Sequence, residues 1–296
     1  MSIRFGVSPI AWANDDMPEL GGDMPLESIL RDIADIGFEG VELGGKFPRE
    51  PEALKAALAP FRLDCVGGWY SGNLLKHGVD AEIAALQDHL RLLKAMNSSV
   101  FVFAETSNAV HSDRGAPLEI TPRLKASDWA QFGARMSGVA DYIASQGLRF
   151  AYHHHLGTVV ESQADMDAFI AATSPSVGFT LDTGHAALGG VKAVDAIERY
   201  PERIAHVHCK DIRGPIHASA RREGKSFLDG VLAGMFTVPG DGSIDFGAVM
   251  KALKAMNYSG WIIVEAEQDP KIADPKLYGK IGLSTLKREA ARAGLI

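Results

Sequence analysis

Histidine and carboxylate side chains are concentrated in one stretch of the chain, residues 148–211. Six of the ten histidines lie there, after three short apolar runs, LRFAY, VGFTL and RIAHV. These runs end in HHH at 153–155, in DTGH at 182–185 and in HVHCKD at 206–211. Imidazole and carboxylate groups bind divalent metals or transfer protons. Segments of helical character separate the runs, so we expect parallel strands whose C-terminal ends bring this chemistry to one mouth.

The rest of the chain repeats the same strand–helix alternation. Five further strand-like runs are expected, at Ile3–Pro9, Gly40–Leu43, Leu63–Val66, Val100–Ala104 and Trp261–Val264. Apolar residues at helical spacing are expected to form helices at Pro25–Ile36, Glu50–Ala59, Asp80–Asn97, Ser127–Gln146, Asp245–Met256 and Pro275–Ala293.

Eight strands in 296 residues predict an α/β fold of one domain spanning residues 1–296, a (β/α)8 TIM barrel. A doubly wound open sheet is the alternative, but it would need a Gly-rich phosphate turn after the first strand. The residues there, Ile10–Asn14, are not such a turn. The polar segment Ile212–Asp241 is a candidate mobile lid over the barrel mouth.

Composition limits the classes of partner. The formal net charge is −7, which disfavours nucleic acid as a ligand. No apolar run approaches the roughly 20 residues that span a bilayer, and the N-terminus has no signal-peptide layout, so we expect no membrane partner. Two cysteines are too few for a disulfide framework, which suits a cytoplasmic location. A homo-oligomer is compatible with all of this.

The alternation of side chains along a strand indicates which residues face the barrel interior. In VGFTLD, the apolar residues share one face and Asp182 falls on the other. The same reasoning places Glu105 inward together with Phe103. The polar residues expected to converge on one mouth are Glu42, Glu105, His153, His155, Asp182, His208, Lys210 and Glu265.

Such crowding of charge needs an explanation, because isolated buried charges cost several kcal/mol. A divalent cation provides one, and the mixed nitrogen and oxygen donors favour Mn²⁺, Co²⁺, Zn²⁺ or Fe²⁺ over Ca²⁺. A hydrogen-bonded structural network is the alternative. Trp12 and Trp69 lie near strand ends, where they can stack on a sugar face; Asn14, Lys46 and Glu105 are further candidate substrate contacts, and His111 can reach the mouth.

Several motifs resemble a known family. LDTGH, HVHCKD and IIVEAEQDP resemble the xylose-isomerase-like barrels of the sugar isomerase/epimerase and endonuclease IV group. PIAWANDDMPELGGDMPLE, GFEGVELGGKFP, AYHHHLGTVVES and WIIVEAEQDP resemble the inosose dehydratases within it. The resemblance spans essentially the whole chain. It implies metal ligands at Asp182, His208 and Glu265. The fourth position falls on His153, where most epimerases have Glu, so Glu105 or His155 can substitute.

The resemblance also implies an activity. Such an enzyme is a hydro-lyase of myo-inositol catabolism: scyllo-inosose (2-keto-myo-inositol), a cyclic ketopolyol, loses water to give a trihydroxycyclohexane-dione. The family is described as using Mn²⁺ or Co²⁺, with glutathione as an additive. A metal on the ketone would stabilise the enolate formed when the α-proton leaves. Candidates for the base are Glu265 and His155. Candidates for the acid are His185, which resembles a substrate-contacting residue of the family, Lys210 and Glu42.

Three other functions fit parts of the pattern. A ketose 3-epimerase or isomerase would share the metal and the enolate but return the proton to carbon. An endonuclease IV-like phosphodiesterase would need three metals and a basic groove, which the acidic balance disfavours. A sugar-binding barrel without turnover would not be expected to keep the acid/base residues around the mouth.

Overall fold

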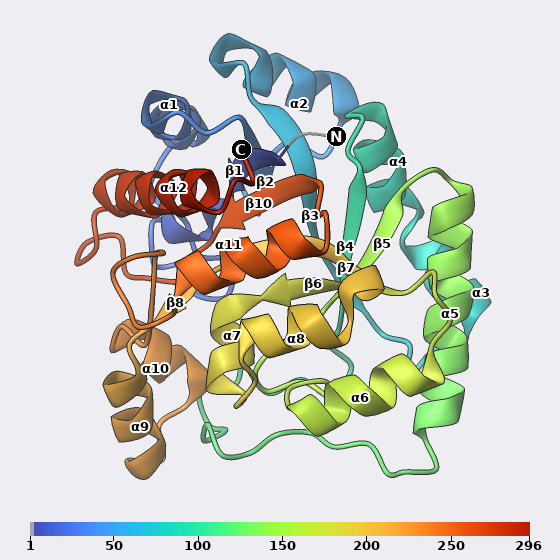
Figure 1. The fold of residues 1–296 in the computed structure, drawn as a ribbon. Coiled ribbons are helices and arrows are strands. Elements are labelled where there is room, and N and C mark those ends of the chain that lie inside the picture. Colours follow the sequence, from blue (N-terminus) through green and yellow to red (C-terminus); the bar gives the residue numbers. More distant parts are fainter. Residues whose placement is uncertain (1–2) are drawn as a thin grey trace.

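A computed structural model describes residues 3–296, and eight parallel strands in it close into a barrel in the order β1-β10-β7-β6-β5-β4-β3-β2 (Figure 1). Because β1 pairs with β10, no edge of this sheet is left open. The predicted (β/α)8 fold is therefore confirmed. The barrel strands are β1 (Ile3–Val7), β2 (Gly40–Leu43), β3 (Asp64–Gly72), β4 (Val100–Glu105), β5 (Arg149–His153), β6 (Gly178–Asp182), β7 (Ile204–Cys209) and β10 (Gly260–Val264).

Helices surround this barrel. The first shows why they form: Ile29, Leu30 and Ile33 lie on one buried face, and Gly37 ends the helix with a φ of 95°. None of the helices in residues 3–296 is long and apolar enough to cross a membrane. They are α1 (Leu26–Ile36), α2 (Pro51–Leu58), α3 (Val79–Ala85), α4 (Gln87–Ala95), α5 (Trp129–Ser145), α6 (Gln163–Ala172), α7 (Thr183–Leu188), α8 (Ala193–Arg199), α9 (Gly214–Arg222), α10 (Phe227–Leu232), α11 (Phe246–Ala255) and α12 (Pro275–Arg292).

Two predicted elements differ in extent from the observed ones. The third strand continues to Gly72, so Trp69 lies within this strand of the barrel and not beyond its end. The helix expected over Asp80–Asn97 is divided into α3 and α4 by a turn at Leu86, where ψ is −4°. Neither difference changes the order of strands around the barrel.

The inside of the barrel holds mostly small and branched side chains together with Trp261, whereas the phenylalanines of the strands pack between the barrel and its helices. This arrangement corrects the predicted orientation of β4. Val102 lies inside, opposite Trp69 of β3, and Phe103 lies outside against Phe150, with ring centroids 5.4 Å apart. Glu105 has the same orientation as Phe103, so it faces outward and the prediction that it faces the mouth is wrong. The interior members are Val66, Val100, Val102, Ala151, Ala205, Trp261 and Ile263.

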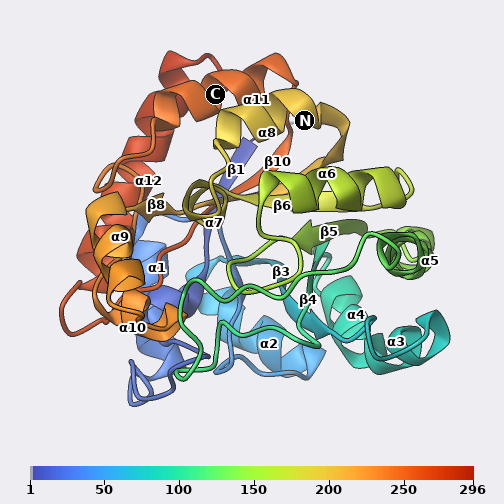
Figure 2. The ribbon, with the colours of Figure 1, turned by 90° about the horizontal axis from the view of Figure 1, so that it is seen from below.

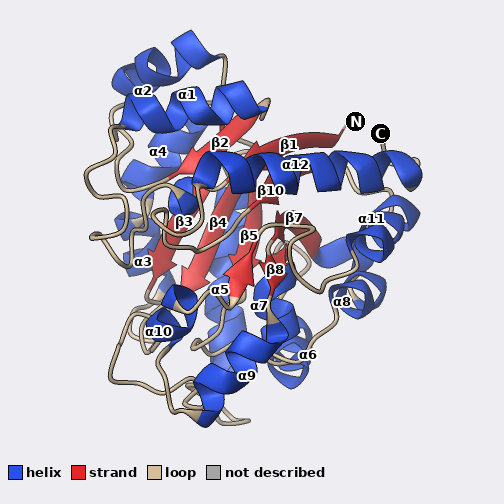
Figure 3. Cartoon of the chain, turned by 90° about the vertical axis from the view of Figure 1, so that its left-hand side faces the viewer, coloured by secondary structure: helices blue, strands red, loops and turns tan. Residues whose placement is uncertain are grey.

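Residues 211–237, which include most of the candidate lid Ile212–Asp241, form regular secondary structure. They contain α9, α10 and two short antiparallel strands, β8 (Asp211–Ile212) and β9 (Phe236–Thr237). A capping box starts α10, in which the Ser226 hydroxyl oxygen accepts from the Asp229 N–H. Figures 2 and 3 show α9 and α10 beside the C-terminal ends of the barrel strands. This insertion therefore packs beside the mouth, where Phe227 contacts His155 and His185.

Candidate active site

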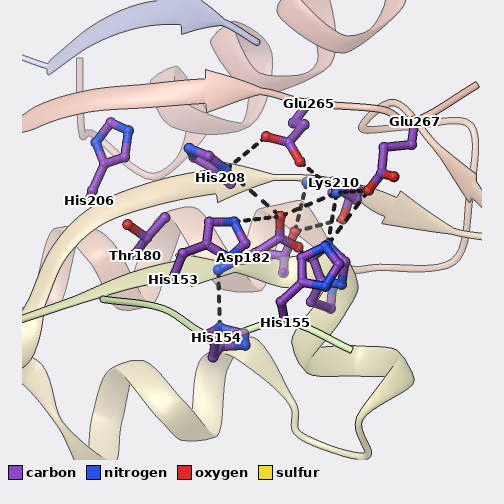
Figure 4. A network of polar contacts seen from close by, with 12 residues as sticks. His153, His154, His155, Thr180, Asp182, His206, His208, Lys210, Glu265 and Glu267 are labelled. Atoms are coloured by element: carbon purple, nitrogen blue, oxygen red, sulfur yellow. Dashed lines mark hydrogen bonds and ion pairs between the residues drawn. The ribbon is translucent and has the colours of Figure 1, made fainter. Parts of the chain in front are cut away.

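Four side chains from consecutive positions around the barrel meet at its C-terminal mouth (Figure 4). They are His153 of β5, Asp182 of β6, His208 of β7 and Glu265, which directly follows β10. One donor atom of each lies within 4.8 Å of the donor atoms of the others, and all four residues are buried. The strand register explains the common height, because Asp182 pairs with His208 across β6 and β7.

This cluster fits a divalent cation. Asp182 Oδ1 accepts from the His185 N–H at the start of α7, which fixes the carboxylate. Its Oδ2 is buried without a hydrogen-bond partner, 3.9 Å from both His153 Nε2 and His208 Nδ1. A buried carboxylate oxygen in this position is costly unless a ligand pairs with it. Two imidazoles and two carboxylates form a donor set typical of Mn²⁺, Co²⁺, Zn²⁺ or Fe²⁺.

Glu42 of β2 orients one member of the cluster. Its Oε1 lies 3.1 Å from His208 Nε2 and 2.9 Å from His206 Nε2. Burial alone would raise the pKa of Glu42, but the two histidines lower it to about 2. An ionised carboxylate at Nε2 keeps the proton on that nitrogen and leaves Nδ1 of His208 directed at the cluster. Glu42 is therefore an acceptor at neutral pH and has no proton to donate.

A buried ammonium group lies beside the cluster. Lys210 is 0% exposed, and its Nζ lies 2.5 Å from Glu265 Oε1, 2.7 Å from Glu267 Oε1 and 3.0 Å from His185 Nε2. Burial opposes its charge, but Glu265, Glu267 and Asp182 raise the pKa of Lys210. Burial also raises the pKa of Glu267, to about 7, against the effect of Lys210. Lys210 therefore stays charged and neutralises part of the acidic cluster.

The cavity above these residues has a volume of about 290 Å³, at the small end of the range for ligand pockets. Trp69 forms one wall, 38% exposed, with its ring edge-on to His153 and His155. His111, from the loop after β4, also lines it. The lining residues include Ser8, Asp15, Asp16, Glu42, Arg49, Trp69, Ser71, His111, His153, His155, His208, Glu265 and Glu267.

His155 and His185 lie in contact next to this cavity, with ring centroids 3.7 Å apart. His155 lines the cavity, whereas His185 is buried behind it and stacks on Phe227 of α10. His155 Nδ1 donates to the Leu156 carbonyl at 2.7 Å, so its Nε2 carries the lone pair. Burial lowers the pKa of both histidines, which keeps them neutral.

Besides His185, which is buried behind His155, four predicted substrate contacts do not line the cavity. Trp12 is fully buried, and its Nε1 donates to Asp32 of α1, because the 3-10 turn at Pro9–Ala11 directs the chain away from the mouth. The side-chain oxygen of Asn14 accepts from the backbone of the following turn. Lys46 donates to the Gly22 carbonyl.

The fourth is Glu105, whose outward orientation also removes it as an alternative metal ligand. Its two carboxylate oxygens accept from the Leu74 and Ser107 N–H groups, at 2.7 and 2.9 Å. These contacts tie the loop that follows β3 to the one that follows β4. The second alternative ligand, His155, lies outside the four-residue cluster and belongs to a neighbouring one with His185 and Glu267.

Sequence reasoning missed two residues that line the cavity, Asp16 and Glu267, and the contact of His206 with Glu42. Asp16 lies in a loop that strand periodicity does not describe. Glu267 lines the cavity two residues after Glu265, and continuing the strand alternation past the end of β10 would have found it.

Comparison with known proteins identifies the family to which this fold belongs. Residues 30–288 match the family described as xylose isomerase-like TIM barrel. The rhizopine catabolism protein MocC of Rhizobium meliloti is 44% identical, over 99% of this chain and 90% of that protein. An inosose dehydratase of Geobacillus thermodenitrificans is 38% identical over 93% of both chains. One of Clostridium botulinum is 36% identical over 98% of both.

Solved structures show the same fold at much lower identity. An L-ribulose 3-epimerase superposes with a TM-score of 0.68 at 17% identity, covering 99% of this chain and 96% of that one. A D-allulose 3-epimerase from Methylomonas gives 0.67 at 16%, covering 97% of both. At these identities the likeness concerns the barrel alone.

Proposed function

Because the chain belongs to the xylose isomerase-like TIM-barrel family, and within it to the inosose dehydratases, we propose that it is a hydro-lyase acting on inosose. The proposed reaction removes water from scyllo-inosose, 2-keto-myo-inositol, to give a trihydroxycyclohexane-1,2-dione in cyclitol catabolism. The observation that carries the proposal is the buried cluster at the barrel mouth, in a cavity sized for one small polyol.

His153, Asp182, His208 and Glu265 would hold the cation, with Mn²⁺ or Co²⁺ as the proposed ion and Zn²⁺ or Fe²⁺ as alternatives. Bound there, a divalent cation would supply Lewis-acid polarisation of the ketone, which acidifies the neighbouring C–H bond. Glu42 would keep His208 in the tautomer that presents Nδ1. Lys210 would limit the net negative charge of the acidic groups.

His155 is the stronger candidate for the base that removes the α-proton. Its Nε2 lone pair is not used by the Leu156 contact, and the residue lines the cavity. Glu265, the other predicted base, has one oxygen at Lys210 and the other 2.8 Å from His208 Nδ1. A base with an unoccupied lone pair at the cavity surface can reach a substrate proton without breaking an existing contact.

Glutathione, expected from the family resemblance, would not act through the protein's own thiols. Both cysteines, Cys65 and Cys209, are buried and neither lines the cavity. Burial raises the pKa of each, which keeps them as unreactive thiols. The proposed reaction therefore needs no thiol–disulfide step, and activity should be the same with and without glutathione once the metal is supplied.

The test offers the purified protein inosose and a ketohexose side by side, with and without Mn²⁺ or Co²⁺. We expect diketone absorbance from inosose only, its loss after treatment with a chelator, and its return with either metal. Full activity in chelated protein would refute the metal site. Epimerised ketohexose without any dehydration of inosose would instead identify a ketose 3-epimerase.

A further inference from the structure

Two side chains on loops at the rim of the cavity have polar groups that the protein itself does not use. Asp16 follows β1 and His111 follows β4, and both line the cavity. His111 is 8% exposed, and its Nδ1 is buried without a hydrogen-bond partner. Within residues 3–296 the Asp16 carboxylate accepts no hydrogen bond either. A buried polar atom without a partner is rare and is expected where a ligand completes the contact. Asp16 and His111 are called the rim pair below.

Neighbouring polar side chains of the cavity have protein partners. Both carboxylate oxygens of Asp15 accept from the Gly45 N–H, at 3.0 and 2.9 Å. Arg49 donates to the Gly44 carbonyl at 3.0 Å, and the Ser71 hydroxyl accepts from the indole of the cavity wall at 2.8 Å. These contacts are satisfied before any ligand enters. The rim pair differs from them because its polar groups have no such contact in the part of the chain that is described.

The rim pair is held in place although its polar groups are free. The side-chain oxygen of Asn14 accepts from the Asp16 and Met17 N–H groups, at 2.8 and 2.9 Å. Met17 is 1% exposed and belongs to the same apolar cluster as Phe227 of α10. The His111 ring packs edge-on against Phe227, with centroids 6.2 Å apart. Both side chains are therefore positioned by the folded loops, and a ligand need not order them.

The two members of the rim pair lie close to each other without contact. Burial lowers the pKa of His111, and the Asp16 carboxylate acts in the opposite direction, so each side chain lies in the electrostatic field of the other. No hydrogen bond or ion pair between them is present among the described residues. An ion pair between Arg114 and Glu19, at 2.8 Å, joins the two loops and helps to fix this separation. A hydroxyl between the two can donate to the carboxylate and accept from the imidazole N–H.

The place of the rim pair relative to the cation cluster indicates which substrate group it meets. The His111 ring lies 4.7 Å from that of His155 and 6.4 Å from that of Trp69. These two rings in turn lie 5.8 and 5.2 Å from that of His153, a member of the cluster. His111 is thus one side chain removed from the cation ligands. In a six-membered ring whose ketone is at the cluster, the carbon opposite the ketone is the farthest, and its hydroxyl takes no part in the dehydration.

We propose that Asp16 and His111 are specificity-determining residues that bind the substrate hydroxyl opposite the ketone; this inference rests on the proposed dehydratase function. The carboxylate accepts from this hydroxyl, and the imidazole N–H donates to it. The contact forms no covalent bond and transfers no proton. Holding the ring at both ends keeps its α-carbon in one position relative to the base. The site therefore selects a cyclic ketone that carries a hydroxyl at the opposite carbon.

The test compares inosose with a deoxy analogue that has hydrogen in place of the hydroxyl opposite the ketone. Asp16→Ala and His111→Phe should each lower kcat/KM for inosose about 10–100-fold, because each removes a hydrogen bond to the substrate. Phenylalanine keeps the ring packing of His111. On the deoxy analogue both variants should stay within a few-fold of the wild-type protein, since the contact is already absent. Asp23→Ala is the matched control, because Asp23 is an exposed carboxylate on the same loop that does not line the cavity.

Equal impairment of the variants on inosose and on the deoxy analogue would indicate a structural role and overturn the proposal, as would an unchanged kcat/KM for inosose. Titration with Mn²⁺ gives a readout that does not depend on turnover: both variants should bind the metal with wild-type affinity, and a large loss would overturn the proposal. If His111→Phe does not fold, Asp16→Ala, at an exposed position, carries the test. A wild-type protein that fails to dehydrate inosose would refute the proposed function instead, and calorimetric binding of inosose and its deoxy analogue to the same variants would still test the rim pair.

Discussion

The substitution Glu42→Gln should weaken metal binding although Glu42 is not itself one of the four proposed metal ligands. Glu42 Oε1 lies within hydrogen-bond distance of both His208 Nε2 and His206 Nε2, in a buried environment. A carboxylate can only accept, so it holds the His208 proton on Nε2 and leaves Nδ1 for the cation. The glutamine side chain can instead donate its amide N–H to Nε2, which favours the tautomer with Nδ1 protonated. Loss of such an orienting carboxylate typically costs about 10–100-fold in metal affinity, or about 1.4–2.8 kcal/mol.

The assay is a titration of the chelator-treated protein with Mn²⁺ or Co²⁺, followed by calorimetry and by recovery of inosose dehydration. The dissociation constant of the variant for the metal should rise about 10–100-fold, while its rate of inosose dehydration at saturating metal should change far less. Glu39→Gln is the control, since Glu39 precedes β2 at the opposite end of the barrel and pairs with Arg4. An affinity unchanged in Glu42→Gln, or lowered equally in Glu39→Gln, would refute the orienting role.

Three further predictions concern other parts of the chain. Glu105→Gln should leave kcat and KM unchanged but lower the unfolding free energy by about 1–3 kcal/mol in urea, because its contacts to Leu74 and Ser107 lie outside the cavity; a large loss of kcat would contradict the outward orientation. Burial lowers the pKa of His89 to about 4, below its unfolded value of 6.5, so the unfolded chain binds more protons there and His89 alone should contribute about 2–3 kcal/mol to the loss of stability between pH 7 and 4.5. His89→Gln should make this loss smaller in urea titrations at the two pH values, and an unchanged loss would disprove the assignment. Trp69→Leu should raise KM for inosose about tenfold by removing the exposed wall of the cavity, with kcat within a few-fold; steady-state kinetics would show an unchanged KM if the indole makes no contact with substrate.

The sequence predicted strand orientation well where large apolar and polar residues alternate. In β6 and β7 the outward positions are Phe179, Leu181 and Val207, so Asp182 and His208 could only face the mouth. In β4, VFVFAE, every residue before Glu105 is apolar, and the alternation alone did not identify the interior side. The orientation of β4 depends on the volume available on each side: its valines fit the barrel interior, and its phenylalanines fit the layer between the barrel and the helices.

Residues beyond strand ends were predicted less well. Trp12 and Asn14 follow β1, but a 3-10 turn and a tight loop direct them into the protein, and loop geometry has no periodic signal. Glu267 was missed for a different reason: its alternation with Glu265 persists, but the predicted strand ended at Val264. The insertion around Phe227 was predicted from its polar composition to be a candidate mobile lid. The packing of its few apolar residues against Leu156 and His155 was not predicted.

The closure of the barrel between its first and last strands also has a consequence for biosynthesis. Lys210 emerges from the ribosome well before Glu265 and Glu267, the two carboxylates nearest to its ammonium group. Among the described residues, the one acidic side chain paired with Lys210 before they arrive is Asp182, at 3.7 Å. Enclosing Lys210 in a partly made barrel would therefore bury a positive charge that is poorly compensated. A nascent chain halted before β10 should therefore keep Lys210 hydrated. In the finished chain, closure of the barrel by β10 should bring Glu265 and Glu267 to Lys210 and complete the active site in the same step.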